Sequence, residues 1–412
     1  MLNIITNYKE EEQEKVPFNR FRFLLNELKP KGKIFTPFNV ISVPIILLGI
    51  YVMFIRFTQG IGSVTNLTQD VPWGLWIAFD VVTGVAFAGG AYVLVFMVHI
   101  LNLKMYKPIV RITVLNGFLA YLFYSGALLL DLGRPLSIVN VIIGNNYGVS
   151  SVLFLVGWHF LLYMLALLLE FSPAVAEWLN APKLRRVLSA LTLGAVIFGI
   201  TLSVLHQSGI GALFLMAKDK IHPLWYNSYM PLMFVVSSIF AGFSLIIFEG
   251  SISHRVFSDQ LDVKSHHNHH KIVLGLAKIC TATMFVYLFM TVIIFIHENN
   301  WVYLNTGMGQ WYLLEIIGFV VLPMVLYFYS FRSQNNLLIR VASILTLLGI
   351  LLNRLNVSMI GFKWDAAVRY VPTWQEVVVT LTIIFIEIWV FRWIVRRMPV
   401  LRKSPDWVNQ TK

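Results

Sequence analysis

Ten apolar runs of membrane-spanning length constrain the fold of this chain more than any other feature of its sequence. A transmembrane helix needs about 20 predominantly apolar residues. Hydrophobic residues make up 58% of the chain and charged residues 13%, against roughly 25% charged residues in average soluble domains. The pattern predicts an all-α, polytopic membrane helix bundle. We place its ten helices at 38–57, 72–101, 109–132, 150–171, 187–207, 229–253, 271–296, 310–330, 337–356 and 375–395.

The basic residues predict which side of the membrane each loop faces. Of the 32 Lys and Arg residues, 24 lie in or beside the two tails and the loops after even-numbered helices, and six beside the loops after odd-numbered helices. Because cytoplasmic loops are enriched in Lys and Arg, we expect both termini in the cytoplasm and the odd-numbered loops in the periplasm. The net charge of +12 therefore reflects the basic cytoplasmic loops, and we do not interpret it as a sign of nucleic-acid binding. We expect a multi-pass protein of the cell inner (cytoplasmic) membrane.

The sequence predicts one transmembrane domain, residues 38–395, between two cytoplasmic tails, 1–37 and 396–412. The first tail fits an amphipathic helix on the membrane surface and a loosely ordered segment equally well. Residues 254–271 form the longest charged inner loop. We interpret this loop as solvated, because its four histidines have no defined ligand geometry; they are His266, His267, His269 and His270.

The single cysteine, Cys280, limits the cofactors that this chain can hold. It excludes a disulfide within the chain, a Cys-ligated iron–sulfur cluster and a covalently attached c-type haem. No two histidines have the spacing of a bis-His haem site, so we expect no haem and no metal in this chain.

Asp80 is the first polar residue that calls for an explanation. It lies about eight residues into the second helix, roughly 12 Å from its start at 1.5 Å per residue, and it shares a helical face with Trp73 and Trp76. A carboxylate at that depth costs about 2.5–3.5 kcal/mol. The residue fits a proton acceptor or substrate contact, and a structural aspartate paired to a neighbouring helix is the alternative.

Three more polar groups fall at the same, outer ends of the helices. Tyr121, Tyr124 and Asp131 share one face of the third helix, and Asp131 and Arg134 could form a loop salt bridge or serve the site. Two further groups flank the loop after the fifth helix, and their histidines titrate near neutral pH and can pass protons. These groups are His206-Gln207-Ser208 and His222-Pro223-Leu224-Trp225.

Buried acids and histidines in a membrane interior can carry protons or can be structural. We hold both interpretations open for each of them. The candidates for a proton path are His159, Glu170, Glu249 and Glu387, and Glu315 is a further intramembrane acid.

The motifs together resemble the NrfD/PsrC family of quinone-reactive membrane subunits. Within it they are similar to the HybB-like branch, the so-called cytochrome b subunits of periplasmic-facing nickel–iron hydrogenases. The matching motifs are Pro72–Asp80, Asp131–Arg134, Ser151–Phe154, Glu170–Ala174, His206–Ser208, His222–Trp225, Phe248–Ser251 and Pro372–Glu376. Each motif is weak alone, and their order and spacing are specific. One departure is Leu155, where HybB-like subunits tend to carry a glutamate. If that acid belongs to a proton path, either His159, one turn along, replaces it or this chain handles protons differently.

The resemblance implies a ten-helix bundle without haem that exchanges electrons with menaquinone or ubiquinone. The partner would be a ferredoxin-like iron–sulfur subunit on the periplasmic face, with a hydrogenase, a molybdenum enzyme or a multihaem cytochrome behind it. His206, Asp80 and Asp131 would be the catalytic groups between the outer halves of helices 2, 3 and 5. The quinone-binding residues would be Trp76, Tyr121, Tyr124, Arg134, Gln207, Ser208, His222 and Trp225.

Two other classes of function stay open: a secondary transporter and a structural membrane anchor. A secondary transporter would use Asp80 and Glu387 as coupling sites, and it predicts an internal repeat, which the sequence does not show. A purely structural membrane anchor of a redox complex predicts polar groups that are paired with each other and no pocket.

Overall fold

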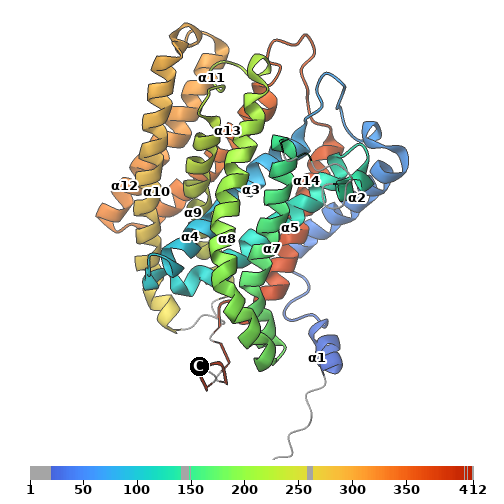
Figure 1. The fold of residues 1–412 in the computed structure, drawn as a ribbon, viewed down its shortest axis with the longest axis vertical. Coiled ribbons are helices and arrows are strands. Elements are labelled where there is room, and N and C mark those ends of the chain that lie inside the picture. Colours follow the sequence, from blue (N-terminus) through green and yellow to red (C-terminus); the bar gives the residue numbers. More distant parts are fainter. Residues whose placement is uncertain are drawn as a thin grey trace, which may run out of the picture.

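A computed structural model of the chain describes residues 20–140, 148, 150–257, 263–402, 404–405 and 407–410. Within these residues, ten helical spans are long and apolar enough to cross a membrane. The prediction of an all-α, ten-span, multi-pass membrane protein is therefore confirmed (Figure 1). Seven spans are built on one regular helix: α2 (Pro37–Gln59), α5 (Lys107–Asp131), α7 (Val152–Trp178), α8 (Pro182–Leu215), α9 (Met230–Val256), α10 (Val263–His297) and α14 (Trp374–Val395).

The other three spans each contain a π-helical segment. The second span runs through η2 (Trp76–Thr83), α3 (Gly84–Phe87) and α4 (Gly89–His99). The eighth joins α11 (Gly307–Ile316), η8 (Ile317–Val321) and α12 (Leu322–Ser333), and the ninth joins α13 (Asn336–Leu355) and η9 (Asn356–Ile360). π-Helical turns are rare and frequently occur at functional sites, and η2 contains Asp80.

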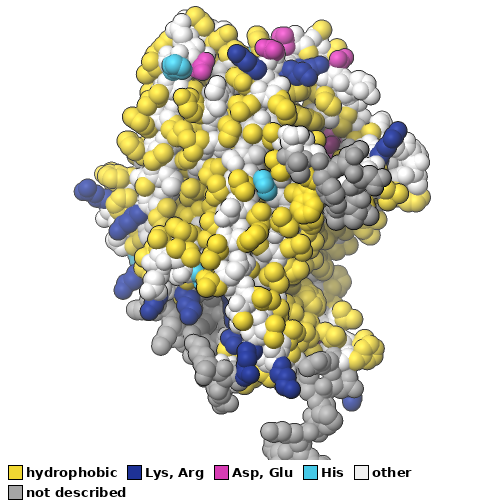
Figure 2. Space-filling model, viewed as in Figure 1, with side chains coloured by type: hydrophobic (Ala, Val, Ile, Leu, Met, Phe, Trp, Pro, Cys, Tyr) yellow, Lys and Arg dark blue, Asp and Glu magenta, His cyan; other side chains and the backbone are white. Residues whose placement is uncertain are grey.

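The two ends of the bundle differ in charge. The short helix α1 (Arg20–Glu27) and the carboxy terminus lie at one end, which we call the termini side, and the opposite end is the far side (Figure 1). Hydrophobic side chains cover most of the face seen in Figure 2. Lys and Arg are spread over its half toward the termini side and also lie at the far side, where the acidic side chains in view gather. Termini on one side agree with an even number of spans; the compartment that this side faces stays a prediction.

Several predicted boundaries differ from the structure, and two of the differences concern candidate functional residues. α8 continues for two turns beyond 207 to Leu215, because Gly211 packs directly against the first turn of α9, where a Cβ atom would lie 2.7 Å from the Met230 carbonyl oxygen. His206 is therefore inside a helix and not at its end. The predicted solvated loop at 254–271 is mostly helical, since α9 ends at Val256 and α10 starts at Val263; the side chains of His266 and His267 lie outside the described residues.

A close backbone contact joins α4 and α9. A Cβ atom on Gly242 would overlap the backbone nitrogen of Gly90, and a Cβ atom on Gly90 would lie 2.6 Å from the carbonyl carbon of Gly242. Small residues let membrane helices approach through their backbones. This contact fixes α9 beside the second span, which carries Asp80.

We expect Gly242→Ala to destabilise the bundle by about 1–3 kcal/mol, because the new methyl group overlaps backbone atoms that cannot move aside. Thermal unfolding in detergent measures the loss. Gly126→Ala on α5 is the matched control, since a Cβ atom there would meet nothing within 4 Å. Equal melting temperatures for the two variants would contradict this account of the α4–α9 contact.

Candidate functional site

Asp80 is the most exceptional polar residue in the described part of the chain. Its side chain is fully buried, and neither carboxylate oxygen has a hydrogen-bond partner among the described residues. Asp131 and Glu387 are close enough to interact with it electrostatically. Buried polar groups are almost always paired, so an unpaired carboxylate beside two other carboxyl groups marks a site where protons can be held.

Tyr124 connects Asp80 to Glu387. Its hydroxyl faces the Glu387 carboxyl group, and it also interacts with Asp80. The tyrosine ring lies against the backbone of Gly84, where a Cβ atom would overlap the ring. The chain thus brings a carboxyl group from η2, a phenol from α5 and a second carboxyl group from α14 close together.

Arg56 holds the far-side end of this group, and the sequence analysis gave it no role. It is buried on α2 and donates hydrogen bonds to the carbonyl oxygens of Leu130 and Leu132, both at 2.6 Å. It also interacts with Asp131. Arg134 is exposed and forms no ion pair with Asp131. A lone arginine in an otherwise apolar run was the signal that could have identified Arg56.

His206 lies in a second group, built from aromatic side chains of α5, α7 and α8. Its ring centroid is 5.6 Å from that of Tyr121 and 5.3 Å from that of Phe160, and Tyr121 packs edge-on against Tyr163 at 4.7 Å. His206 Nδ1 contacts the Val156 carbonyl oxygen at 3.1 Å. Its Nε2 has no hydrogen-bond partner among the described residues, which leaves one nitrogen available to exchange a proton.

The neighbours of His206 differ in how firmly they are held. Gln207 donates from Nε2 to the Val85 carbonyl oxygen at 2.7 Å and so ties α8 to α3. Ser208 only donates back to Leu205 in its own helix. His159 Nδ1 and Glu170 Oε1 are buried without partners in the described part of the chain. Both lie on α7; His159 is close enough to interact with His206, and Glu170 with Tyr163.

His222 and Trp225 form a third group, near the far side. His222 is buried, its Nδ1 accepts a hydrogen bond from the Leu224 amide at 3.2 Å, and aromatic rings of Trp225, Tyr303 and Trp364 surround it. Trp225 Nε1 donates to Glu315 Oε2 at 2.7 Å. These contacts attach the loop before α9 to α11 and to the segments that contain Tyr303 and Trp364, separately from Asp80 and His206.

Glu315 itself is fully satisfied. Besides Trp225, the amides of Asn353 and Asn356 donate to it at 2.7 and 2.5 Å. Arg354 lies next to this network, with its guanidinium 3.6 Å from the centroid of the Phe234 ring. Glu315 thus links several segments of the bundle through hydrogen bonds, which supports a structural role for this acid.

The tryptophans before Asp80 do not share one face, contrary to the sequence prediction. Trp73 precedes the first helical residue and packs against Phe362 and Phe214. Trp76 is buried and donates from Nε1 to the Glu376 carbonyl oxygen at 3.2 Å. The prediction assumed an α-helix from residue 72, whereas the helix begins later and is π-wound.

A large cavity of about 670 Å³ lies between α2, α4, α5, α9 and α14. Its wall is mostly apolar, and four of its polar residues are Tyr124, Glu387, Asn116 and Glu249, with Arg392 and Arg396 lining its part nearest the termini side. The Asn116 amide donates to the Glu249 carboxylate. This size is typical of small-molecule pockets, and an apolar pocket with a few convergent polar groups is the usual binding site. Asp80, Asp131 and His206 do not line it.

The structure thus separates the predicted site residues into three groups. Asp80, Asp131, Tyr124 and Glu387 belong together, Tyr121, His206, His159 and Glu170 form the second group, and His222 and Trp225 the third. Among the described residues, no group of three or more His, Cys, Asp or Glu side chains could hold a metal ion.

A bundle of ten apolar spans with carboxyl groups buried beside an apolar cavity defines a polytopic membrane protein with polar groups in its interior. The family of polysulphide reductase, NrfD, matches residues 63–363, and the chain belongs to this family, as the sequence motifs predicted.

Three relatives give the range of this similarity. Over 374 residues, the chain is 42% identical to a protein of Nitratidesulfovibrio vulgaris (strain Hildenborough), covering 90% of this chain and 96% of the relative. It is 28% identical to the probable Ni/Fe-hydrogenase 2 b-type cytochrome subunit of Escherichia coli (strain K12), covering 90% and 94%. It is 25% identical to a selenate reductase subunit of Mesobacillus selenatarsenatis, covering 51% and 55%.

The burial of His222 predicts a pH dependence of stability. Burial lowers the pKa of this histidine below its usual value of 6.5, so the folded protein binds its proton less readily than the unfolded chain. The free energy of unfolding therefore falls as the pH decreases through and below about 6.5. His222→Asn keeps an acceptor for the Leu224 amide and removes the titration, so thermal unfolding between about pH 7 and pH 5 should depend less on pH.

The exposed His297 offers the control for this measurement. His297→Asn should leave the pH dependence as it is in the unmodified protein. An equal flattening in both variants would assign the effect to something other than His222.

Proposed function

We propose that this chain is the membrane subunit of a respiratory oxidoreductase complex that exchanges electrons between an iron–sulfur partner and membrane quinone. Two relatives are by name subunits of a hydrogenase and of a selenate reductase. The observation that carries the proposal is the 670 Å³ apolar cavity that reaches Tyr124 and Glu387, the two side chains beside the unpaired carboxylate of Asp80. The substrate would be menaquinone or ubiquinone.

The shape and lining of the cavity suit a quinone. Its isoprenoid chain needs an apolar space, which Phe87, Phe248 and Phe391 help to provide. Its two ring carbonyls accept hydrogen bonds, and the Tyr124 hydroxyl and a protonated Glu387 are donors. Sequence alone favoured a site between helices 2, 3 and 5 beside His206; the cavity supports one that opens on α5, α9 and α14 instead, with Asp80 and Asp131 behind Tyr124.

The reaction needs two electrons and two protons for each quinone reduced to quinol. The electrons would come one at a time from an iron–sulfur cluster of the partner, and the protons from side chains at the ring, as general acid catalysis requires. Glu387 and Tyr124 would be the immediate proton donors, and Asp80 would restore the proton of Tyr124. In quinol oxidation the same groups would accept protons.

The group around His206 would form a second route for protons, separate from the one through Tyr124 and Glu387. His206 has a free nitrogen, and Tyr121, Tyr163 and Glu170 continue from it along α5 and α7. His159 lies close enough to His206 to interact with it. Glu249 would supply Glu387 across the cavity, since the two carboxyl groups interact electrostatically.

The partner would dock on the far side. Under the positive-inside rule the termini side faces the cytoplasm, so the far side would face the periplasm. A ferredoxin-like subunit there would bring its cluster near η2 and Asp131. A hydrogenase, a molybdenum enzyme or a multihaem cytochrome would stand behind it.

Purification from native membranes in mild detergent, with mass spectrometry of the bound subunits, tests the partner. We expect a ferredoxin-like iron–sulfur protein together with one of these catalytic subunits. A chain that purifies alone from cells that express it well would contradict the proposal and favour a transporter.

Glu387→Gln should lower quinone turnover of the purified complex by about 100-fold, because it removes a proton donor at the ring. Trp389→Phe, on the same helix, is the control: this indole bonds to Ser42 on α2 and does not line the cavity. Turnover is followed optically, and gel filtration shows whether the complex is intact. Unchanged turnover in Glu387→Gln would exclude this site.

His206→Ala, measured in the same assay, tests the second group. We expect quinone turnover to be abolished while the complex assembles normally. Normal turnover in this variant would remove His206 from the mechanism and leave the first group as the whole site.

A further inference from the structure

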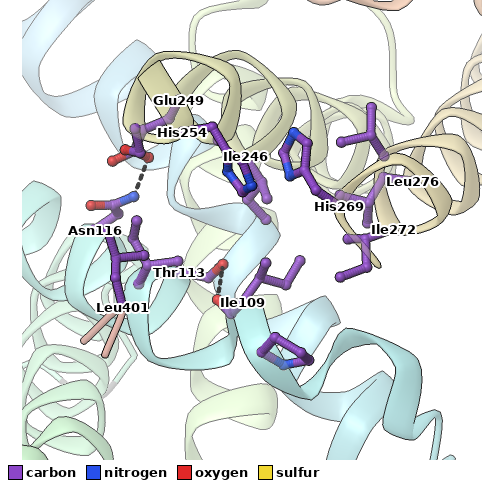
Figure 3. A pocket seen from close by; sticks show the side chains of 15 residues that line it. Ile109, Thr113, Asn116, Ile246, Glu249, His254, His269, Ile272, Leu276 and Leu401 are labelled. Carbon is purple, nitrogen blue, oxygen red and sulfur yellow. Dashed lines mark hydrogen bonds between the residues drawn. The ribbon is translucent and has the colours of Figure 1, made fainter. Parts of the chain in front are cut away.

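A pocket of about 50 Å³, whose lining side chains are drawn in Figure 3, shares part of its wall with the large cavity. α5, α9 and the start of α10 form its walls, and Asn116 and Glu249 line both spaces. Glu249 is thus a carboxyl group that touches two neighbouring pockets, and its only hydrogen bond in the described structure comes from Asn116. It lies where a proton passing between them would be held.

Two histidines lie across this pocket from Glu249. The rings of His254 on α9 and His269 on α10 are stacked, with centroids 3.7 Å apart and planes inclined by 28° (Figure 3). The same two side chains also line a wide hollow of about 790 Å³, together with Arg255 and Arg340. The stacked pair therefore separates the hollow from the pocket that contains Glu249.

The surroundings of the pair favour proton transfer between the two spaces. Imidazole is the side chain that gains and loses a proton nearest to neutral pH. Among the side chains that the structure describes, the charged groups that line the pocket and the hollow beside the pair are Glu249 and Arg255 from α9 and Arg340 from α13. The described lining residues from α5 carry no charge, and apart from His269 the same holds for those from α10; they are Pro108, Ile109, Ile112 and Thr113, and Ile272, Val273 and Leu276. The negative charge of Glu249 favours transfer of a proton from the histidine pair toward it. The two stacked rings lie close to each other and to the two arginines, and like charges repel, so protonation of both rings at once is disfavoured.

We propose that His254 and His269 form the proton entrance of the complex on the termini side, passing protons to Glu249 and from there across the cavity to Glu387. This inference rests on the proposed quinone chemistry. Each transfer moves one proton from an imidazolium to a carboxylate, and the imidazole regains its proton from the hollow. Protons would then enter from the side opposite to the electron partner, so turnover would move charge across the membrane.

The test uses the complete complex reconstituted in liposomes, with quinone turnover and proton uptake from the termini side measured together. We expect His254→Ala combined with His269→Ala to lower both by at least about tenfold, most strongly at alkaline pH. Added imidazole should restore turnover, because a small diffusible base can occupy the space of the missing rings. A purely structural role would not respond to imidazole.

His270→Ala is the matched control. It lies next to His269 on α10, but its nitrogens contact Asn336 and Gln334 at 2.8 and 3.2 Å instead of facing the pocket. We expect wild-type turnover in this variant. If the double alanine variant does not assemble, the double His→Gln variant keeps most of the volume and tests the same loss.

The outcomes separate the two proposals. Normal turnover in the double variant, in a preparation whose wild type reduces quinone, overturns the entrance and leaves the quinone function standing. Proton uptake from the far side in the wild type overturns the entrance as well. No quinone turnover in the wild type with its partner bound overturns the proposed function itself.

Discussion

The interior of this bundle depends on how it offsets the free-energy cost of burying carboxyl groups away from water. Lipid offers no hydrogen bonds, so each buried acid must find its partners within the protein or remain unpaired. Glu177 has two arginine partners: Arg111 binds it in bidentate fashion at 2.8 and 2.9 Å, and Arg185 binds it at 2.8 Å. Glu315 has three neutral donors. Asp80 has none in the described structure, and its position next to Tyr124 and Glu387 is the feature on which the proposed chemistry depends.

Local helix geometry puts the unpaired carboxylate in place. The π-winding of η2 shifts Asp80 relative to the face expected for an α-helix, and Gly84, directly after η2, leaves room for the Tyr124 ring. On the far side, Arg56 bonds to two carbonyl oxygens at the end of α5 and fixes the neighbourhood of Asp131. An alanine at 84 would overlap the Tyr124 ring and displace this tyrosine from its place beside Asp80 and Glu387.

The fold could be predicted from the sequence because long apolar runs are a strong signal for membrane-spanning helices. Ten apolar runs leave few alternatives in a membrane, and Asp80, Tyr124 and Glu387 could each be identified as unusual from their apolar surroundings. Their grouping could not, since it depends on how distant helices pack. The α4–α9 contact through Gly90 and Gly242 is one example, and the extension of α8 past His206 is another: both depend on backbone contacts that no local pattern encodes.

The stacked histidines are another contact between helices that the sequence alone does not predict. A charged segment rich in histidine fits a solvated loop, and only the contact of α9 with α10 brings His254 onto His269. The large cavity lies between α9 and α14, so α9 takes part in three features: it meets the second span at Gly242, carries Glu249 in the cavity wall and presents His254 to the hollow. A single helix that links these positions would couple proton entry at the termini side to chemistry near Asp80, because a shift of α9 would change all three contacts at once.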